Sequence, residues 1–224
     1  MTDLPSQPAR PAPFIVFEGI EGCGKSTQIE LLAGRLRSAG REPLLTREPG
    51  GTPLGEALRK LLLDWTGGEI DGLTELFLLE ASRRVHVRTV VRPALEAGRI
   101  VISDRFADSS IAYQGGGRGL DVGMIERFNR VATGGLAADL TILLDLPAEQ
   151  GLERVRRRDR VKDRLEREVL AFHESVRDAY LTHARERGEP GYRIIDARRS
   201  PDDIAACVYA WVAAVLAGGS ENRG

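Results

Sequence analysis

The residues best suited to do chemistry lie in one short segment near the N-terminus. They match the pattern G-x-x-x-x-G-K-[ST] and are Gly19, Ile20, Glu21, Gly22, Cys23, Gly24, Lys25, Ser26 and Thr27. Glycines let such a loop curl so that its N–H groups point inward, and the following helix start adds positive dipole character. The pattern predicts binding of nucleotide phosphates, with Lys25 at the β and γ phosphates and the Ser26 hydroxyl on Mg²⁺.

A phosphate-binding loop alone leaves several protein classes open. GTPases, motor ATPases, transporters and small-molecule kinases all use it. No N-K-x-D motif for reading guanine is found, and no large regulatory region accompanies the loop, which favours a small-molecule kinase. Two weaker interpretations stay open. One is a fortuitous glycine-rich turn, and the other is a redox role for Cys23, although the loop needs only the backbone N–H of that residue.

The elements that must position this loop alternate along the chain between apolar strand-type runs and amphipathic helical stretches. We expect strands at 14–17, 43–46, 99–103, 139–145 and 192–196. We expect helices at 25–38, 53–63, 72–97, 121–132, 147–157, 163–187 and 201–216. This alternation predicts an α/β fold, a five-stranded parallel sheet with helices on both faces, whose ligands bind beyond the carboxyl ends of the strands.

Composition predicts one domain, at residues 13–216. Residues 1–12 are proline-rich and poor in large apolar side chains, so we expect a disordered tail there, and a second flexible tail at 217–224. Lys and Arg number 32 against 33 Asp and Glu, so any anion site must be local. We find no secretion signal and no apolar run of the roughly 18 residues that a membrane span needs. We therefore expect a cytoplasmic protein that binds neither nucleic acid nor membrane.

Four further motifs, taken with the loop, resemble those of bacterial thymidylate kinases in order and separation. The motifs are FEGIEGCGKST at 17–27, TREPGGTP at 46–53, SDRF at 103–106, SSIAYQGGGRG at 109–119 and DRLE at 163–166. The resemblance covers about residue 13 to the C-terminal helix. It implies transfer of a phosphoryl group from ATP, with Mg²⁺ as cofactor, to thymidine monophosphate (dTMP). It also implies a homodimer and a P-loop kinase fold closed over by a mobile lid.

The resemblance places cations for the acceptor opposite the loop. Arg59 and Arg105 are assigned to the acceptor phosphate, because a planar guanidinium donates two bonds to phosphate oxygens and stays charged. Arg83 is assigned to the base and its surroundings. Asp104 is assigned to the water shell of Mg²⁺ or to orienting Arg105. A surface salt bridge for Arg59 and a simple strand cap for Asp104 stay open.

Polar residues of the SSIAYQGGGRG motif are assigned to the nucleoside. Gln114 carries a donor and an acceptor that match the edge of thymine, and Ser110 is the second polar contact, with Ser109 beside it. Tyr113 is expected against the sugar, where a 2′-hydroxyl would collide with its ring. Glu21 resembles the family acid near the 3′-hydroxyl and phosphate. Alternatively, Tyr113 and Gln114 simply cap a helix before the glycines.

One position departs from the family pattern. Four residues before Arg83, where an aromatic ring usually stacks on thymine, this chain has Leu79, with Phe77 two positions away. An aromatic contact contributes about 0.5 to 1.5 kcal/mol beyond area burial. We therefore expect Leu79 to cover the base with about two- to tenfold lower affinity.

Cations crowd the segment 152–166, which has the place of the lid in small-molecule kinases. Family members without an arginine in the loop supply the catalytic arginine from this lid. The candidates are Arg156, Arg158, Arg160 and Arg164, with Arg158 and Arg164 favoured. Three alternatives stay open for the chain: a kinase for another nucleoside monophosphate or a deoxynucleoside, a silent nucleotide-binding regulatory module, and an RNA-binding protein.

Overall fold

A computed structural model describes residues 12–157, 164–166, 168–189 and 191–221. These residues include a five-stranded sheet in the order β2-β3-β1-β4-β5, in which every neighbouring pair is parallel. The strands are β1 (Phe14–Glu18), β2 (Leu44–Arg47), β3 (Val101–Asp104), β4 (Leu140–Asp145) and β5 (Tyr192–Asp196). The predicted parallel sheet and each predicted strand are confirmed.

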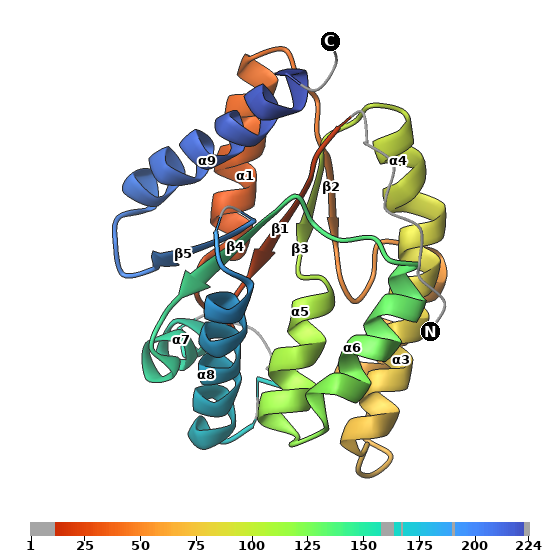
Figure 1. Ribbon diagram of the computed structural model, residues 1–224. Coiled ribbons are helices and arrows are strands. Elements are labelled where there is room, and N and C mark those ends of the chain that lie inside the picture. The colour runs from red at the N-terminus through yellow and green to blue at the C-terminus, as the bar shows by residue number, and fades with distance from the viewer. Residues whose placement is uncertain (1–11, 158–163, 167, 190, 222–224) are drawn as a thin grey trace.

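Helices cover both faces of the sheet (Figure 1). The longer ones are α1 (Lys25–Ser38), α2 (Pro53–Asp64), α3 (Gly72–His86), α6 (Val122–Thr133), α7 (Ala148–Arg156), α8 (Leu170–Arg187) and α9 (Pro201–Glu221). The shorter ones are α4 (Arg92–Glu96), α5 (Ala107–Ser110) and two π-helices, η1 (Val87–Val91) and η2 (Ile111–Gly117). The α/β class is therefore confirmed.

Strand β1 shows why the sheet needs a helical layer on each side. Successive side chains of a strand point to opposite faces. Ile15 and Phe17 join the core cluster that contains residues of α1 and α9, whereas Phe14 and Val16 join the cluster with η1 and α4. All four side chains are buried, so β1 is the central strand of a two-sided core.

Register brings the site residues to one edge of the sheet. Phe17 of β1 and Arg47 of β2 both pair with Asp104 of β3. The loop after β1, the segment after β2 and the segment after β3 therefore leave the sheet side by side at its carboxyl edge, which is where the sequence predicts ligand binding.

Several helix boundaries differ from the prediction. The expected helix 72–97 is divided into α3, η1 and α4, and the expected helix 163–187 begins only at Leu170. Helix α9 continues to Glu221, so 217–221 is helical rather than the flexible tail expected there. Helices α5 and η2 were not predicted at all.

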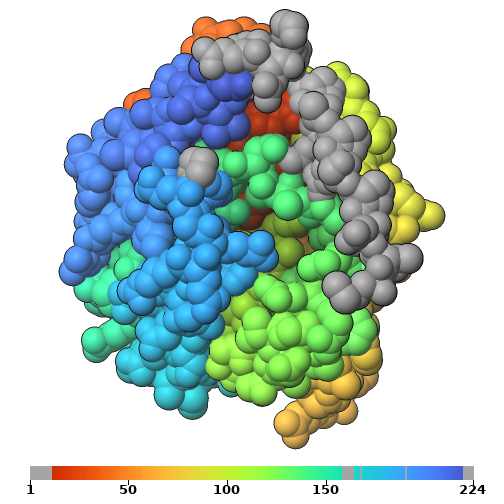
Figure 2. All heavy atoms as spheres, in the orientation of Figure 1, coloured from red at the N-terminus to blue at the C-terminus, as the bar shows by residue number. Residues whose placement is uncertain are grey.

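The glycines at 115–117 belong to η2, which packs closely on α8. A Cβ on Gly116 would lie 2.5 Å from Cβ of Ala179, and one on Gly117 would lie 2.5 Å from the ring of Phe172. In Figure 2, α8 (blue) and the green segment of η2 and α6 form one continuous surface on this face. The glycines therefore permit close helix contact, and Tyr113 and Gln114 do not cap a helix before the glycines but lie with them inside η2.

Helix α9 corrects one expectation from the sequence. Its segment Pro201–Gly218 has a mean hydropathy of 1.3. By length and composition alone, this helix is long and apolar enough to span a membrane. Core packing gives another reason for its apolar residues, since Ile204, Val208 and Val212 are buried in the same cluster as Leu32 of α1. Such a helix is weak evidence for membrane insertion.

Candidate active site

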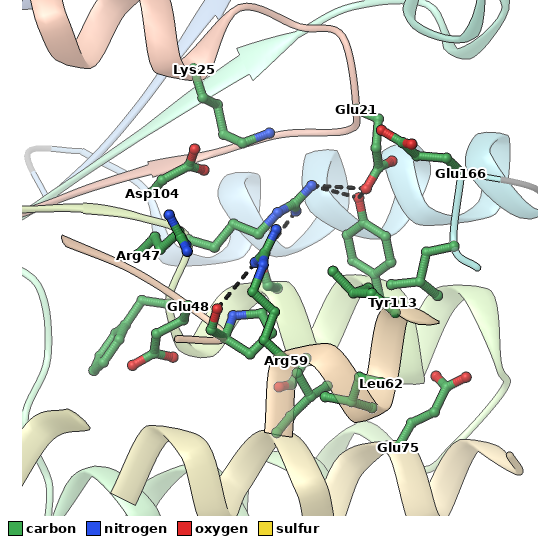
Figure 3. A pocket seen from close by; sticks show the side chains of 18 of the residues that line it. Glu21, Lys25, Arg47, Glu48, Arg59, Leu62, Glu75, Asp104, Tyr113 and Glu166 are labelled. Atoms are coloured by element: carbon green, nitrogen blue, oxygen red, sulfur yellow. Dashed lines mark hydrogen bonds and ion pairs between the residues drawn. The ribbon is translucent and has the colours of Figure 1, made fainter. Parts of the chain in front are cut away.

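A cleft opens at the carboxyl edge of the sheet, and most of the predicted site residues line it (Figure 3). From the phosphate-binding loop it takes Glu21, Gly22, Gly24, Lys25, Ser26 and Thr27. From the acceptor set it takes Arg59, Leu79, Arg83, Asp104, Arg105, Ser109, Ser110, Tyr113 and Gln114. Ile20 and Cys23 of the loop instead pack into the core below it. The structure thus brings together residues that are far apart in the sequence.

The phosphate-binding loop has the backbone that its glycines allow. Gly24 precedes α1 with a φ of 99°, in the left-handed region. Gly22 packs so closely on α7 that a Cβ there would lie 2.3 Å from the carbonyl oxygen of Gly151. Lys25 donates to the carbonyl oxygens of Gly19 at 2.9 Å and Ile20 at 3.1 Å. Its ammonium group is therefore held inside the loop, next to the space for phosphates.

Arg105 connects the loop to the acceptor side of the cleft. Its Nη2 donates to Glu21 at 3.0 Å and to the Tyr113 hydroxyl at 2.8 Å, while Nη1 donates to Tyr180 at 3.0 Å. The guanidinium also lies 4.8 Å from the ring centroid of Tyr113, a cation–π contact. Burial alone would lower the pKa of Arg105, but the neighbouring Tyr113, Tyr180 and Glu21 raise that pKa well above its ordinary value. The cation is permanent.

Glu21 is an acceptor in this arrangement. Burial alone would raise its pKa, but the adjacent His173 and the cations Arg105 and Lys25 lower that pKa well below the ordinary value. Its Oε1 accepts from the Tyr113 hydroxyl at 2.5 Å, whereas Oε2 lies 3.4 Å from Nδ1 of His173. Among the described residues no well-directed hydrogen bond reaches Oε2. An ionised Glu21 can therefore accept from a substrate hydroxyl.

Behind Arg105 lies Glu18, a fully buried acid at the end of β1. Burial and Asp108 raise the pKa of Glu18 to about 7, against the opposing influence of Arg105 and of its hydrogen bonds. The carboxyl group accepts from the backbone N–H of Phe106 at 2.8 Å and from the hydroxyls of Ser109 and Tyr180, each at 2.7 Å. Ser109 and Tyr180 also accept hydrogen bonds from Arg105. Glu18 therefore holds in place two partners of that arginine.

Two further arginines project toward the middle of the cleft in Figure 3. Arg59 of α2 donates to the carbonyl oxygen of Pro49 at 3.1 Å, and Arg47, at the end of β2, pairs with Glu56 at 2.8 Å. With Arg105 they make this part of the cleft strongly cationic. Arg47 was not predicted as a site residue, although its position directly after the expected strand 43–46 was a signal for it.

The far end of the cleft is polar and buried. Arg83 is 2% exposed and donates through Nε to Glu48 at 2.8 Å, through Nη1 to Ser110 at 3.0 Å and through Nη2 to the carbonyl oxygen of Phe106 at 3.0 Å. Glu80 is a further ion-pair partner. Arg83 therefore stabilises the wall of the cleft. Its predicted contact with a base would use the second N–H of Nη2, because the first donates to Phe106.

The amide nitrogen of Gln114 has a hydrogen-bond partner among the described residues, whereas the amide oxygen has none. Nε2 donates to Glu75 at 3.0 Å. Oε1 is buried and receives no hydrogen bond from the described residues. A buried acceptor without a donor costs free energy, about 1–3 kcal/mol, unless a ligand supplies one. Gln114 is thus prepared to accept a hydrogen bond from a ligand in the cleft.

Leu79 lines the cleft as expected, but Phe77 does not take over as the missing aromatic. Phe77 is 50% exposed and packs edge-on against Phe128, 5.5 Å between ring centroids. It is not among the residues of the cleft wall, whereas Phe106 and Tyr113 are. Leu79 therefore gives this part of the cleft wall an aliphatic side chain where an aromatic one was expected from the family pattern.

The structure describes only part of the predicted lid. Arg158 and Arg160 lie outside the described residues. Arg164 is described, and its guanidinium donates to the carbonyl oxygen of Leu62 at 2.9 Å and pairs with Glu75 at 2.7 Å. These partners place Arg164 at the far end of the cleft, away from the phosphate-binding loop, so this arrangement gives no support to its predicted catalytic role.

Ser26 and Asp104 were predicted around Mg²⁺. Both line the cleft at the loop end, where Figure 3 places Asp104 on the same side as Lys25. Their hydroxyl and carboxylate are hard oxygen donors, and Mg²⁺ is commonly held by one or two such groups together with waters and substrate phosphates. Within the described part of the chain no cluster of three metal-ligating side chains is found. The donor set suits a metal that arrives with a nucleotide.

Some residues that contact the predicted site residues could not be recognised in the sequence. Each of four residues contacts a predicted site residue but lies far from it in the chain: Glu18, Glu75, His173 and Tyr180. Their burial was the missing information, because a charged residue on a predicted helix or strand looks like a surface residue until its neighbours are known.

Fold and site together define a P-loop kinase of the α/β class, with the phosphate-binding loop on one side of the cleft and several arginines opposite. The model of the thymidylate kinase family matches residues 17–208. The chain therefore belongs to the thymidylate kinase family, whose members are ATP-dependent nucleoside monophosphate kinases.

Relatives in several bacteria agree with this assignment. A thymidylate kinase of Desulfovibrio desulfuricans is 51% identical over 197 residues, which cover 85% of this chain and 90% of that protein. One of Nitratidesulfovibrio vulgaris is 51% identical, covering 91% and 93%. One of Thermomicrobium roseum is 50% identical, covering 93% and 98%.

Proposed function

We propose that the chain transfers the γ-phosphoryl group of ATP to an oxygen of the dTMP phosphate. The bond from the γ phosphorus to the bridging oxygen of ADP breaks, a new phosphorus–oxygen bond forms, and thymidine diphosphate and ADP leave. The acceptor oxygen is already anionic near neutral pH, so no strong general base is needed. The residues therefore serve to position two anions and to stabilise their charge.

On the donor side, the loop binds the phosphates through its N–H groups and Lys25. Lys25 exchanges its bonds to Gly19 and Ile20 for bonds to phosphate oxygens. We assign Mg²⁺ to Ser26 and Asp104, where it would offset negative charge on the phosphates. A catalytic arginine from the lid, with Arg158 as a candidate, stays a prediction.

On the acceptor side, Arg105 is assigned to the phosphate, with Arg59 and Arg47 beside it. The bond between Arg105 and Glu21 keeps the guanidinium at the centre of the cleft before the substrate arrives. Glu21, held ionised by its lowered pKa, accepts from the 3′-hydroxyl. Tyr113 lies between these two residues, and its ring is assigned to the deoxyribose.

Gln114 carries the choice of base. Its buried Oε1 lacks a donor among the described residues. Thymine presents an N–H group at N3, whereas cytosine presents an acceptor there and would leave both atoms unpaired. This observation supports thymine over cytosine. Arg83 and Ser110 are assigned to the remaining polar edge of the base.

An ADP-release assay with ATP, Mg²⁺ and a panel of nucleoside monophosphates tests the proposal. We expect kcat/KM to be highest for dTMP and to fall by at least about 100-fold in Arg105→Ala, because a charged contact to the phosphate is lost. Arg37→Ala is the matched control, since this exposed arginine of α1 pairs only with the exposed Glu42 among the contacts described. Preference for another monophosphate would overturn the assignment of Gln114, and no turnover would indicate a silent nucleotide-binding module.

We also propose that the enzyme is a homodimer, as the family resemblance implies. An apolar face of α3 and α6 supports this: Leu73 is 37% exposed, Phe77 50% and Val131 74%. The two helices lie side by side at one edge of the molecule (Figure 1). A cytoplasmic location and the absence of nucleic-acid or membrane partners stay predictions from the sequence.

A further inference from the structure

Glu75 is a buried acid that no step of the proposed reaction uses. It lies in the first turn of α3 and is 1% exposed. Three groups from distant segments converge on its carboxylate: Nε2 of Gln114 at 3.0 Å, Nη2 of Arg118 at 2.9 Å and Nη1 of Arg164 at 2.7 Å. Burying a charged group requires such partners, but two arginines would satisfy it. The contact with Gln114 calls for a separate reason.

That contact determines which way the amide of Gln114 faces. A carboxylate only accepts hydrogen bonds, so the amide must turn its N–H₂ group toward Glu75. Turned the other way, the amide oxygen would lie about 3 Å from a carboxylate oxygen, two acceptors in contact. Arg118 and Arg164 can only donate, and both pair with the same carboxyl group. The amide oxygen of Gln114 is thereby left pointing away from Glu75, buried and without a donor.

We infer that Glu75 is a positioning residue that sets the base specificity of the acceptor site. It fixes Gln114 with its oxygen toward the base, so that the site favours a pyrimidine with N3–H over one whose N3 accepts. This inference rests on the proposed function, because it assumes that Gln114 faces the base of the acceptor. Without Glu75, the amide can turn over and donate to N3 of cytosine.

The test compares base discrimination in the wild type and Glu75→Gln. A glutamine at 75 presents either an oxygen or an N–H₂ group, so it no longer dictates the orientation of Gln114. We measure the KM for dTMP, the inhibition constant of dCMP as a competitor, and the KM for ATP. The ratio of the dCMP constant to the dTMP KM is expected to fall by roughly tenfold, the equivalent of one hydrogen bond. The KM for ATP is expected to change by less than about twofold.

The matched control is Glu168→Gln. Glu168 accepts from Nη2 of Arg118 at 2.7 Å, so it belongs to the same ion network, but it does not contact Gln114 or line the cleft. It is expected to keep the wild-type ratio. If Glu75 merely stabilised the fold, both variants would lower Tm and neither would change the ratio.

Glu75→Asp covers the case in which Glu75→Gln does not fold. Aspartate keeps the charge for the arginines but withdraws the carboxylate from Gln114 by one methylene. A fall in the ratio in either folded Glu75 variant, with Glu168→Gln unchanged, supports the inference. An unchanged ratio in every Glu75 variant that folds, or an equal fall in Glu168→Gln, overturns it while leaving the proposed function in place. Failure of the wild type to phosphorylate dTMP overturns the proposed function and this inference with it.

Discussion

Arg105 is held in the cleft by its backbone as well as by its side chain. Its φ of 73° lies in the left-handed region, which is rare for a residue with a side chain and costs of order 1 kcal/mol. Two hydrogen bonds hold that conformation, from its N–H to Phe17 at 2.9 Å and from the Ser103 hydroxyl to its carbonyl oxygen at 2.7 Å. The turn aims the guanidinium back over the loop that follows β1, where it bonds to Glu21.

The assignment of Leu79 to the base can be tested by a substitution that should increase the affinity for dTMP. Leu79→Phe restores an aromatic face against the space for the base, so we expect the KM for dTMP to fall by about two- to tenfold with little change in kcat. Leu61→Phe is the matched control, because Leu61 of α2 is exposed and does not line the cleft. An unchanged or higher KM in Leu79→Phe would refute the assignment of Leu79 to the base.

Glu18 predicts a pH dependence of stability. The pKa of Glu18 is raised from 4.5 to about 7 in the fold, so between these values the folded chain holds a proton that the unfolded chain has lost. The contribution of protonated Glu18 to the free energy of unfolding is fully present below pH 4.5. It is lost as pH rises to about 7, a decrease of roughly 3 kcal/mol. Glu18→Gln does not titrate.

Urea unfolding of both proteins at several pH values measures this difference. The free energy of unfolding of Glu18→Gln, minus that of the wild type, should rise by roughly 3 kcal/mol from about pH 4.5 to pH 7.5. Other titrating groups affect both proteins alike and cancel in the difference. A difference that stays constant over this range would show that Glu18 is ionised in the fold.

At the scale of elements, strands and helix starts were predictable, and helix interiors less so. Helix α1 spans the predicted residues 25–38 because Gly24 and the preceding loop define its start. The expected helix 72–97 contains Pro93, which lacks an N–H group and clashes with the carbonyl four residues earlier. The chain accommodates it with the wider π-helix η1 and continues as α4. The spacing of apolar residues in the sequence does not indicate such a change from α-helix to π-helix.

Helix η2 was missed for a tertiary reason. Its glycines resemble a turn in the sequence, but their lack of side chains is needed against Ala179 and Phe172 of α8, which lie more than fifty residues further along the chain. Site residues on this element, such as Tyr113 and Gln114, were found by their types in a motif. Their partners Glu21 and Glu75 could not be paired with them, because the contact exists only after η2 has packed.

The contact between α7 and the phosphate-binding loop is testable by one methyl group. A Cβ on Gly151 would lie 2.5 Å from the carbonyl oxygen of Glu21, so Gly151→Ala must displace the loop backbone. Since small displacements of positioned groups reduce rates strongly, we expect kcat/KM for ATP to fall by about tenfold or more.

Gly34→Ala is the control within α1. Gly34 is exposed, and nothing lies within 4 Å of an added Cβ. Alanine stabilises a helix interior by about 1 kcal/mol over glycine, so this variant should unfold at higher urea and keep its activity. Equal kinetics in both variants would show that the loop tolerates displacement at α7.

For the whole molecule, α3 carries both the apolar outer face and several residues of the cleft. Phe77 faces outward, while Glu75, Leu79 and Arg83 of the same helix line the cleft. In the proposed homodimer, a partner would cover the exposed face of α3 and restrain this helix. Assembly would then favour binding of the acceptor more than binding of ATP, because the phosphate-binding loop precedes a different helix, α1.

Phe77→Glu combined with Val131→Glu tests this arrangement. Both side chains are half-exposed or more in the single chain, so two added charges should leave the fold intact but prevent burial against a partner. Sedimentation velocity is expected to give a dimer for the wild type and a monomer for the double variant. Val169→Glu, at an exposed valine preceding α8, is the control and should stay dimeric. In the monomer the KM for dTMP should rise more than the KM for ATP, and a dimer that survives both charges would place the interface on another face.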